Sequence, residues 1–69
     1  MRKWLKNLRI EHKISQQFVA DKLKISQNYY ANIENGERQK DLDLSMALKL
    51  SKIFDVSIDW IIAEEEKLK

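Results

Sequence analysis

The chain has 69 residues, no cysteine, no proline and one glycine, and its net charge is +2 at pH 7. A chain of this length can form one small domain, and the lack of cysteine excludes disulfides and thiolate zinc sites. Because charges interrupt every apolar stretch, we expect neither a membrane span nor a signal peptide, and a cytoplasmic protein is the simplest interpretation.

Charge is distributed unevenly along the chain. Residues 1–40 carry nine Lys/Arg and four Asp/Glu, a net +5, whereas residues 41–69 carry a net −3. A basic front half and an acidic back half suit a protein that presents one side to a polyanion. Two solvated surfaces would produce the same pattern, so charge alone does not decide between these interpretations.

Two helices are predicted in the first third of the chain, since a sequence almost free of glycine and proline disfavours strands joined by tight turns. The first covers residues 2–12, and its apolar stripe contains Trp4, Leu5 and Leu8. Ser15 is the predicted N-cap of the second, residues 16–23, because its hydroxyl can accept an unpaired N–H of the first turn. The apolar face of this second helix contains Val19, Ala20 and Leu23.

A third helix is predicted to follow the cap Ser26 and to stop at Gly36, since glycine readily ends a helix. At about 100° per residue, Tyr30 and Ile33 lie on one side of it and a row of amides lies on the other. Amides are mediocre helix formers, but they offer the donor and acceptor that pair with adenine in a major groove. A polar solvent face is the alternative, although Glu and Lys are more usual there. The amides are Gln27, Asn28, Asn32 and Asn35.

Two more helices are predicted in the acidic half. Asp41 and Asp43 are rival caps for the fourth, and we prefer Asp43, with a helix that runs to Phe54 and core candidates Ala47, Leu50, Ile53 and Phe54. Ser57 can cap a fifth helix that continues into the charged tail. The sequence therefore predicts one compact all-α domain over residues 1–69, in which residues 43–66 serve for packing and possible dimerisation.

The segment ISQQFVADKLKISQNYYANIENGER resembles the helix-turn-helix of the lambda repressor and Cro regulators, the XRE family of phages and bacteria. Its marks are LKNLR in the first helix, SQ at the start of the second, an alanine four residues after that Gln, and IENG closing the third. The resemblance covers about residues 5–62, with the motif at residues 16–35. It implies a lambda-repressor-like five-helix domain that regulates transcription, more often as a repressor, and binds a palindromic double-stranded DNA operator as a homodimer.

The resemblance also assigns roles to single residues. Base reading is implied for Gln27, Asn28 and Asn32. Phosphate contacts are implied for Gln16, Tyr29, Asn35, Arg38, Lys13, Lys22, Lys24 and Lys40, with packing as the alternative for Tyr29. A structural ion pair that orients the third helix is implied for Arg9 and Glu34. A dimer interface is implied for Ile58, Asp59 and Trp60.

Three features depart from the family pattern or leave alternatives. Lys24 stands where the turn usually has a glycine in the left-handed conformation. Phe18 points away from Ala20, so it either covers the last helices or belongs to a contact surface. Residues 60–62 are three consecutive apolar residues on a helix, and we expect two of them to be buried unless this helix forms a dimer surface.

The second functional hypothesis is a protein-interaction module, such as the antitoxin of a toxin–antitoxin pair. Phe18, Trp60 and the acidic EEE run would be its evidence. An enzyme has little support, since the chain offers one histidine, no cysteine, no glycine-rich phosphate loop and no cleft of paired carboxylates. His12 is expected to serve as a helix-end cation, and neither a cofactor nor a metal is expected.

Overall fold

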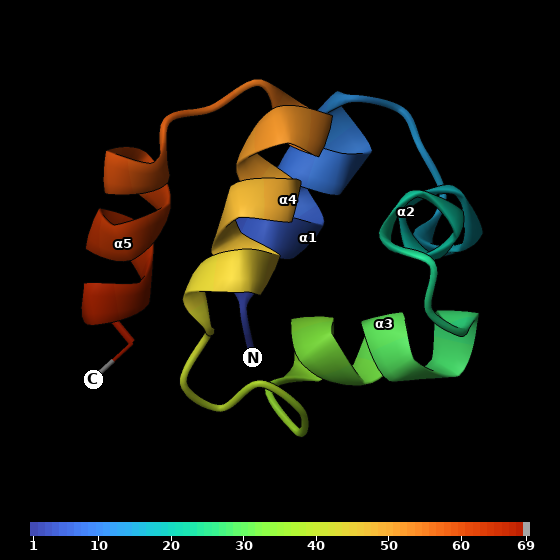
Figure 1. The fold of residues 1–69 in the computed structure, drawn as a ribbon, viewed down its shortest axis with the longest axis horizontal. Coiled ribbons are helices and arrows are strands. Elements are labelled where there is room, and N and C mark those ends of the chain that lie inside the picture. Colours follow the sequence, from blue (N-terminus) through green and yellow to red (C-terminus); the bar gives the residue numbers. More distant parts are fainter. Residues whose placement is uncertain (69) are drawn as a thin grey trace.

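Five helices form the fold in the computed structural model, which describes residues 1–68 (Figure 1). They are α1 (Lys3–Glu11), α2 (Gln16–Leu23), α3 (Gln27–Asn35), α4 (Leu44–Phe54) and α5 (Ile58–Glu66). No strand occurs within the described residues, and the predicted all-α class is confirmed. None of these helices has the length and apolarity needed to cross a bilayer.

Side-chain caps set the start of four helices. Ser15 and Ser26 each accept an N–H of the following turn, at 3.0 Å for α2 and 3.1 Å for α3. Asp43 does the same for α4 at 2.7 Å, and Ser57 for α5 at 3.0 Å. Each such cap stabilises its helix by about 1 kcal/mol. The predicted caps are therefore confirmed, including the preference for Asp43 over Asp41.

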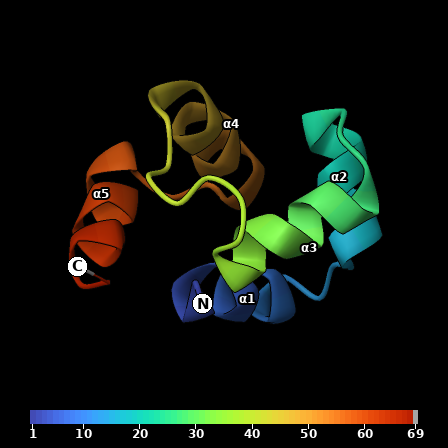
Figure 2. The same ribbon diagram turned by 90° about the horizontal axis from the view of Figure 1, so that it is seen from below.

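The core lies where the five helices meet. Figure 1 shows α4 in front of α1, with α5 on one side of this pair and α2 and α3 on the other. Seen from below, α3 crosses the molecule between α1 and α4 (Figure 2). The buried apolar side chains come from every helix: Trp4, Leu5, Leu8, Val19, Ala20, Leu23, Tyr30, Ile33, Met46, Ala47, Leu50, Phe54 and Ile61. Ile53, a predicted core residue, packs on their edge and is partly buried.

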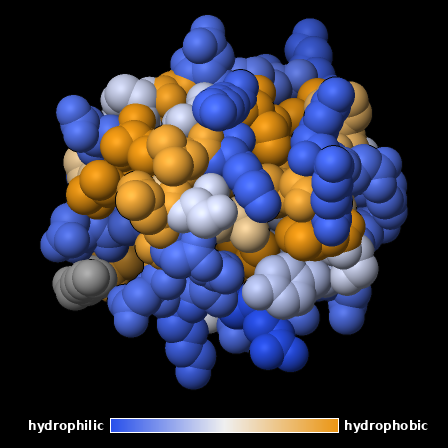
Figure 3. Space-filling view, in the orientation of Figure 1, coloured by the Kyte–Doolittle hydropathy of each residue, from blue (hydrophilic) through white to orange (hydrophobic). Residues whose placement is uncertain are grey.

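The apolar run at the start of α5 corrects one expectation. Only Ile61 is buried, whereas Trp60 is 38% and Ile62 48% exposed. The expectation of two buried residues was wrong because α5 packs through a narrow stripe, and consecutive residues diverge by about 100° around a helix. Figure 3 shows hydrophobic side chains gathered on this face over α4 and α5. The large exposed apolar residues of these two helices are Leu44, Leu48, Trp60 and Ile62.

Every connection between the helices contains a residue in the left-handed conformation. Lys13, Lys24 and Asp55 have φ values of 57°, 60° and 53°, and the α3–α4 loop contains Gly36 at 82° and Gln39 at 53°. Gly36 is the one glycine among them. Lys24 thus keeps the backbone conformation of the helix-turn-helix turn without the residue type that favours it, at a cost of roughly 1–2 kcal/mol.

Replacing Lys24 with glycine is expected to stabilise the fold by about 0.5–1 kcal/mol. The gain from relieving the left-handed strain exceeds the extra backbone freedom that glycine has in the unfolded chain. The measurement is the urea midpoint at an unchanged m value. Lys22→Gly, which also removes an exposed lysine but lies within α2, is the matched control and should destabilise by about 1 kcal/mol. A lowered midpoint for Lys24→Gly would contradict the strain argument.

Candidate nucleic-acid interface

The solvent-facing side of α3 is a row of amides on an uncovered helix. In Figure 2 no other helix crosses in front of α3. Tyr30 and Ile33 hold the opposite side of the helix in the core, both at 0% exposure. The amide row therefore faces outward from a helix that is fixed from behind. Gln27, Asn28 and Asn35 are exposed and Asn32 is partly exposed.

None of the four amide side chains forms a hydrogen bond within residues 1–68. Each amide has a carbonyl acceptor and two N–H donors, so the row offers both functions to a ligand without breaking an internal bond. This pattern matches the acceptor and donor that adenine presents in the major groove. A groove about 12 Å wide admits one helix, and α3 is exposed in the way this requires.

Behind the amide row, an ion pair joins α1 to α3. The Arg9 Nε donates to Glu34 Oε2 at 2.7 Å, and the exposed fractions of the two side chains are 14% and 2%. Arg9 also donates to the Ile14 carbonyl at 3.1 Å, which connects the pair to the segment before α2. The charge of the buried carboxylate is thus compensated by the guanidinium, and the pair fixes the orientation of α3 about its axis relative to α1.

Gln16 belongs to the same cluster. Its Nε2 donates to Glu34 Oε1 at 3.2 Å, so its side chain lies against α3 and is partly buried. The Tyr30 hydroxyl is buried without a hydrogen-bond partner among the described residues. Burial, and then the neighbouring Glu34 carboxylate, raise the pKa of Tyr30, so this hydroxyl stays protonated. Glu34 thus accepts hydrogen bonds from Arg9 of α1 and Gln16 of α2, and Gln16 lies at the edge of this cluster.

Tyr29 and Arg38 pack together beside the amide row. The Arg38 guanidinium lies over the Tyr29 ring, 5.9 Å from its centroid, in a cation–π contact. The Tyr29 ring is partly buried against the core, as in the packing alternative, and Arg38 is exposed. The Arg38 cation is therefore held close to the exposed side of α3.

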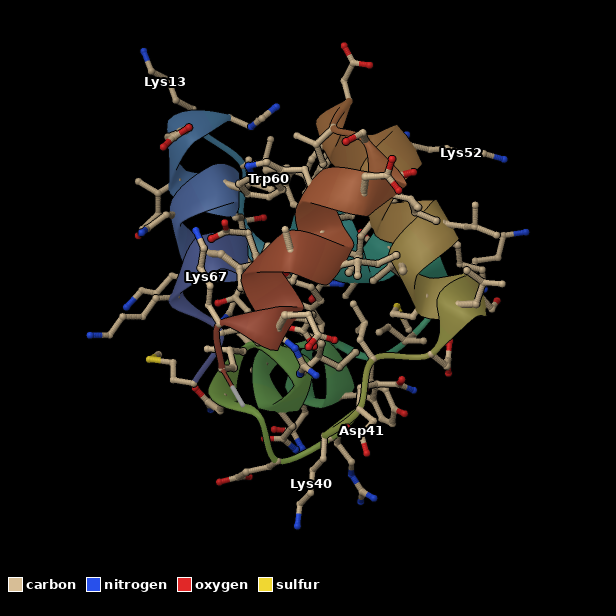
Figure 4. The ribbon with its side chains drawn as sticks, turned by 90° about the vertical axis from the view of Figure 1, so that its left-hand side faces the viewer. Lys13, Lys40, Asp41, Lys52, Trp60 and Lys67 are labelled. Carbon is tan, nitrogen blue, oxygen red and sulfur yellow. The ribbon has the colours of Figure 1, made fainter. Side chains whose placement is uncertain are left out.

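The structure separates the lysines predicted for phosphate contact. Lys24 precedes α3 in the turn and Lys40 follows it in the loop, both exposed. Figure 4 shows Lys40 at the end of the molecule near α3 and Lys13 at the opposite end. Lys24 and Lys40 thus flank the amide row, and Lys13 does not join them.

Phe18 and Lys22 form a separate feature on α2. Phe18 is 44% exposed, and the Lys22 Nζ lies 5.3 Å from the centre of its ring. Together with Lys52 and Ile53 of α4 they line a shallow hollow. Phe18 therefore borders α4 and remains accessible.

Of the residues predicted for a dimer interface, the structure brings two to the surface. Asp59 and Trp60 are exposed on α5, whereas Ile58 is partly buried and packs on the core. The Trp60 ring makes an edge-to-face contact with Trp4, with ring centroids 5.8 Å apart. The Trp4 Nε1 in turn donates to Glu65 at 2.8 Å. The exposed edge of Trp60 is therefore held in a defined position.

His12 is the C-cap residue of α1. Its Nδ1 lies 2.8 Å from the Leu8 carbonyl oxygen, and its ring meets Phe54 edge to face at 5.3 Å. Within residues 1–68, no three side chains of the His, Cys, Asp or Glu type are grouped as a metal site would require.

Sequence reasoning missed Arg2 and Glu65. Arg2 is 2% exposed, and its Nε lies 3.0 Å from Glu65 Oε2. The two residues are 63 positions apart in the chain, so neither periodicity nor local spacing could have paired them.

Comparisons with known proteins find one family model and three relatives. The family model described as helix-turn-helix matches residues 5–61. Three curated proteins of Bacillus subtilis (strain 168) are similar to the chain. The uncharacterized HTH-type transcriptional regulator YqaF is 40% identical over 66 residues, which cover 96% of this chain and 82% of YqaF. No solved structure gives a significant match.

Two of these relatives are longer. The uncharacterized HTH-type transcriptional regulator YqaE is 37% identical over 65 residues, 94% of this chain and 54% of YqaE. The HTH-type transcriptional regulator ImmR is 36% identical over 67 residues, 97% of this chain and 51% of ImmR. The chain thus spans about half the length of YqaE and ImmR.

Proposed function

The chain belongs to the XRE-type helix-turn-helix family, and from this premise we propose that it is a sequence-specific, double-stranded DNA-binding regulator of transcription. The observation that carries the proposal is the solvent-facing row of amides on α3, whose side chains have no hydrogen-bond partner within residues 1–68. The helix is held from behind by the Arg9–Glu34 pair. Such a helix can enter a major groove with its readers already oriented.

In this proposal Gln27, Asn28 and Asn32 read base edges, and each good bidentate pair contributes about 1–3 kcal/mol of discrimination. Phosphate contacts hold α3 in the groove and make binding sensitive to salt. The candidates for these contacts are Gln16, Tyr29, Asn35, Arg38, Lys24 and Lys40, whereas Lys13, which the resemblance also implied, lies at the opposite end of the molecule. Lys24 and Lys40 are the best placed, because they flank α3 and are exposed.

We further propose that two copies bind a palindromic operator. A symmetric dimer places its two recognition helices about 34 Å apart, which matches half-sites one helical turn from each other. The exposed Asp59 and Trp60 of α5, with Ile58 behind them, would form the interface. Such a dimer would repress transcription by blocking polymerase, and on bacterial or phage DNA it would act in the cytoplasm.

Replacing Trp60 with alanine is expected to weaken dimerisation by about 2 kcal/mol, roughly thirtyfold, because a buried Trp is a typical interface hot spot. Cooperative occupation of the two half-sites should disappear, whereas affinity for one half-site should persist. The measurement is a band-shift titration on operators with one or two half-sites. Ile10→Ala, at an exposed apolar residue of α1, is the control. Unchanged cooperativity in Trp60→Ala would exclude this interface.

The test of the proposed function is selection of bound duplexes from a random DNA pool at about physiological salt. A palindromic motif with half-sites one turn apart would support a dimeric sequence reader. Recovery of no motif, with weak salt-dependent binding, would contradict base reading by α3. The alternative of an interaction module would then be examined at Phe18 and Trp60.

A further inference from the structure

Arg2 completes the C-terminal end of α3 although it belongs to the start of α1. The last four carbonyls of a helix have no partner within it. The Arg2 backbone N–H donates to the Glu34 carbonyl at 2.7 Å, and its Nη1 donates to the Ile33 carbonyl at 2.7 Å. One residue at the start of α1 thus donates to two of these carbonyls, and the Ile33 carbonyl also accepts the Gly36 N–H at 3.2 Å. Figure 2 shows the N-terminus beside this end of α3.

The same guanidinium holds the loop that follows α3. Its Nη1 donates to the Arg38 carbonyl at 3.2 Å, and its Nη2 donates to the Gln39 carbonyl. Gln39 is in the left-handed conformation, and its side chain accepts the Asp43 N–H at 3.2 Å. The backbone on both sides of Arg38 is therefore fixed, and Lys40 follows immediately.

Glu65 of α5 keeps the guanidinium in this orientation. The Arg2 Nε lies 3.1 and 3.0 Å from its two carboxylate oxygens. The carboxylate also accepts the Trp4 indole N–H at 2.8 Å, so it is itself held in place. A cation at the C-terminus of a helix is favoured by the helix dipole, and Glu65 supplies the counter-charge that burial of Arg2 requires.

We propose that Arg2 is a positioning residue for DNA binding, which fixes the end of α3 and residues 36–41 so that Arg38 and Lys40 reach phosphates. This inference rests on the proposed function. Arginine is needed because its planar guanidinium has five donors in fixed directions, and here they reach three carbonyls and one carboxylate. A lysine in its place would keep the charge but could not form most of these bonds.

The test compares Arg2→Lys with the wild-type protein under conditions in which circular dichroism shows both to be folded. The first measurement, without DNA, is amide hydrogen exchange at Glu37 and Arg38, whose N–H groups bond the Asn32 carbonyl. We expect exchange to be about tenfold faster in the variant, as for the removal of one hydrogen bond. The second is the salt dependence of affinity for the operator selected with wild-type protein. The slope should fall by about one for each phosphate that the variant no longer binds.

Phe54→Leu, a core truncation at the far end of α4, is the control for mere destabilisation and should leave the slope unchanged. Glu65→Gln keeps an acceptor for the Trp4 indole but removes the counter-charge of Arg2. It should speed up amide exchange and lower the salt slope as Arg2→Lys does, but by a smaller amount. It replaces Arg2→Lys as the test if that variant does not fold.

If Arg2→Lys and Glu65→Gln show the amide exchange rates and the salt slope of the wild-type protein, the role of Arg2 is overturned. The role is also overturned if Phe54→Leu lowers the salt slope as much as these variants do. Failure of the wild-type protein to select any DNA motif would instead overturn the proposed function, on which the role depends. The two failures are therefore distinguishable.

Discussion

Replacing Asn28 with alanine is expected to weaken specific binding by about 5- to 150-fold at each half-site, since a bidentate amide–adenine pair contributes about 1–3 kcal/mol. Asn28 is exposed on the first turn of α3 and its side chain has no hydrogen-bond partner among residues 1–68, so its replacement should remove readout without disturbing the core. Alanine also propagates helices better, so stability should not fall. The measurement is competition between the selected operator and random duplex at one fixed salt concentration.

The salt dependence of binding separates a base reader from a phosphate contact. Asn28→Ala should leave the slope of affinity against salt unchanged and flatten sequence preference at its own position. Lys24→Ala should weaken binding to all sequences alike and lower the slope by about one. Lys49→Ala, at an exposed lysine of α4, is the negative control. If Asn28→Ala keeps the wild-type preference, α3 does not read through this residue.

Replacing Arg9 with methionine is expected to destabilise the fold by about 3–5 kcal/mol, as for the removal of one partner from a buried ion pair. Glu34 is 2% exposed and would lose the guanidinium that compensates its charge, while keeping the neutral amide of Gln16 as a donor. A domain of this size has a total stability of about 3–10 kcal/mol, so this change would unfold much of the population. The measurement is urea unfolding followed by circular dichroism.

Two comparisons test whether the unpaired carboxylate is the cause. The double variant Arg9→Met/Glu34→Met should recover most of the stability, since apolar replacements of buried pairs are often neutral. Lys67→Met breaks the pair with Glu64 at a lysine that is 71% exposed, and should change stability by less than about 1 kcal/mol. If the double variant is as unstable as Arg9→Met, poorer packing rather than an unpaired charge explains the effect.

Local patterns in the sequence were sufficient for the helices. Each N-cap accepts the N–H of the residue three positions later, so its position follows from nearby residues alone. These caps are Ser15, Ser26, Asp43 and Ser57. The packed side of α3 is local too, because helical periodicity places Tyr30 and Ile33 together.

Features that depend on how the helices are placed relative to one another were not predictable in this way. Periodicity gives no measure of how wide a stripe α5 buries, so the burial of Trp60–Ile62 was predicted wrongly. Lys13 was grouped with the other lysines by resemblance, yet the α1–α2 connection carries it to the far end of the molecule. The Arg2–Glu65 pair joins residues 63 positions apart in the sequence, which no local rule relates.

The left-handed residues in the helix connections bear on how long the protein would persist in a cell. Four of the five are not glycine, and each of the four shifts the balance slightly toward the unfolded chain. Proteases degrade that unfolded fraction, so small decreases in stability shorten the lifetime of a protein. Replacing strained residues such as Lys24 with glycine is therefore expected to lengthen the lifetime of the protein in a cell.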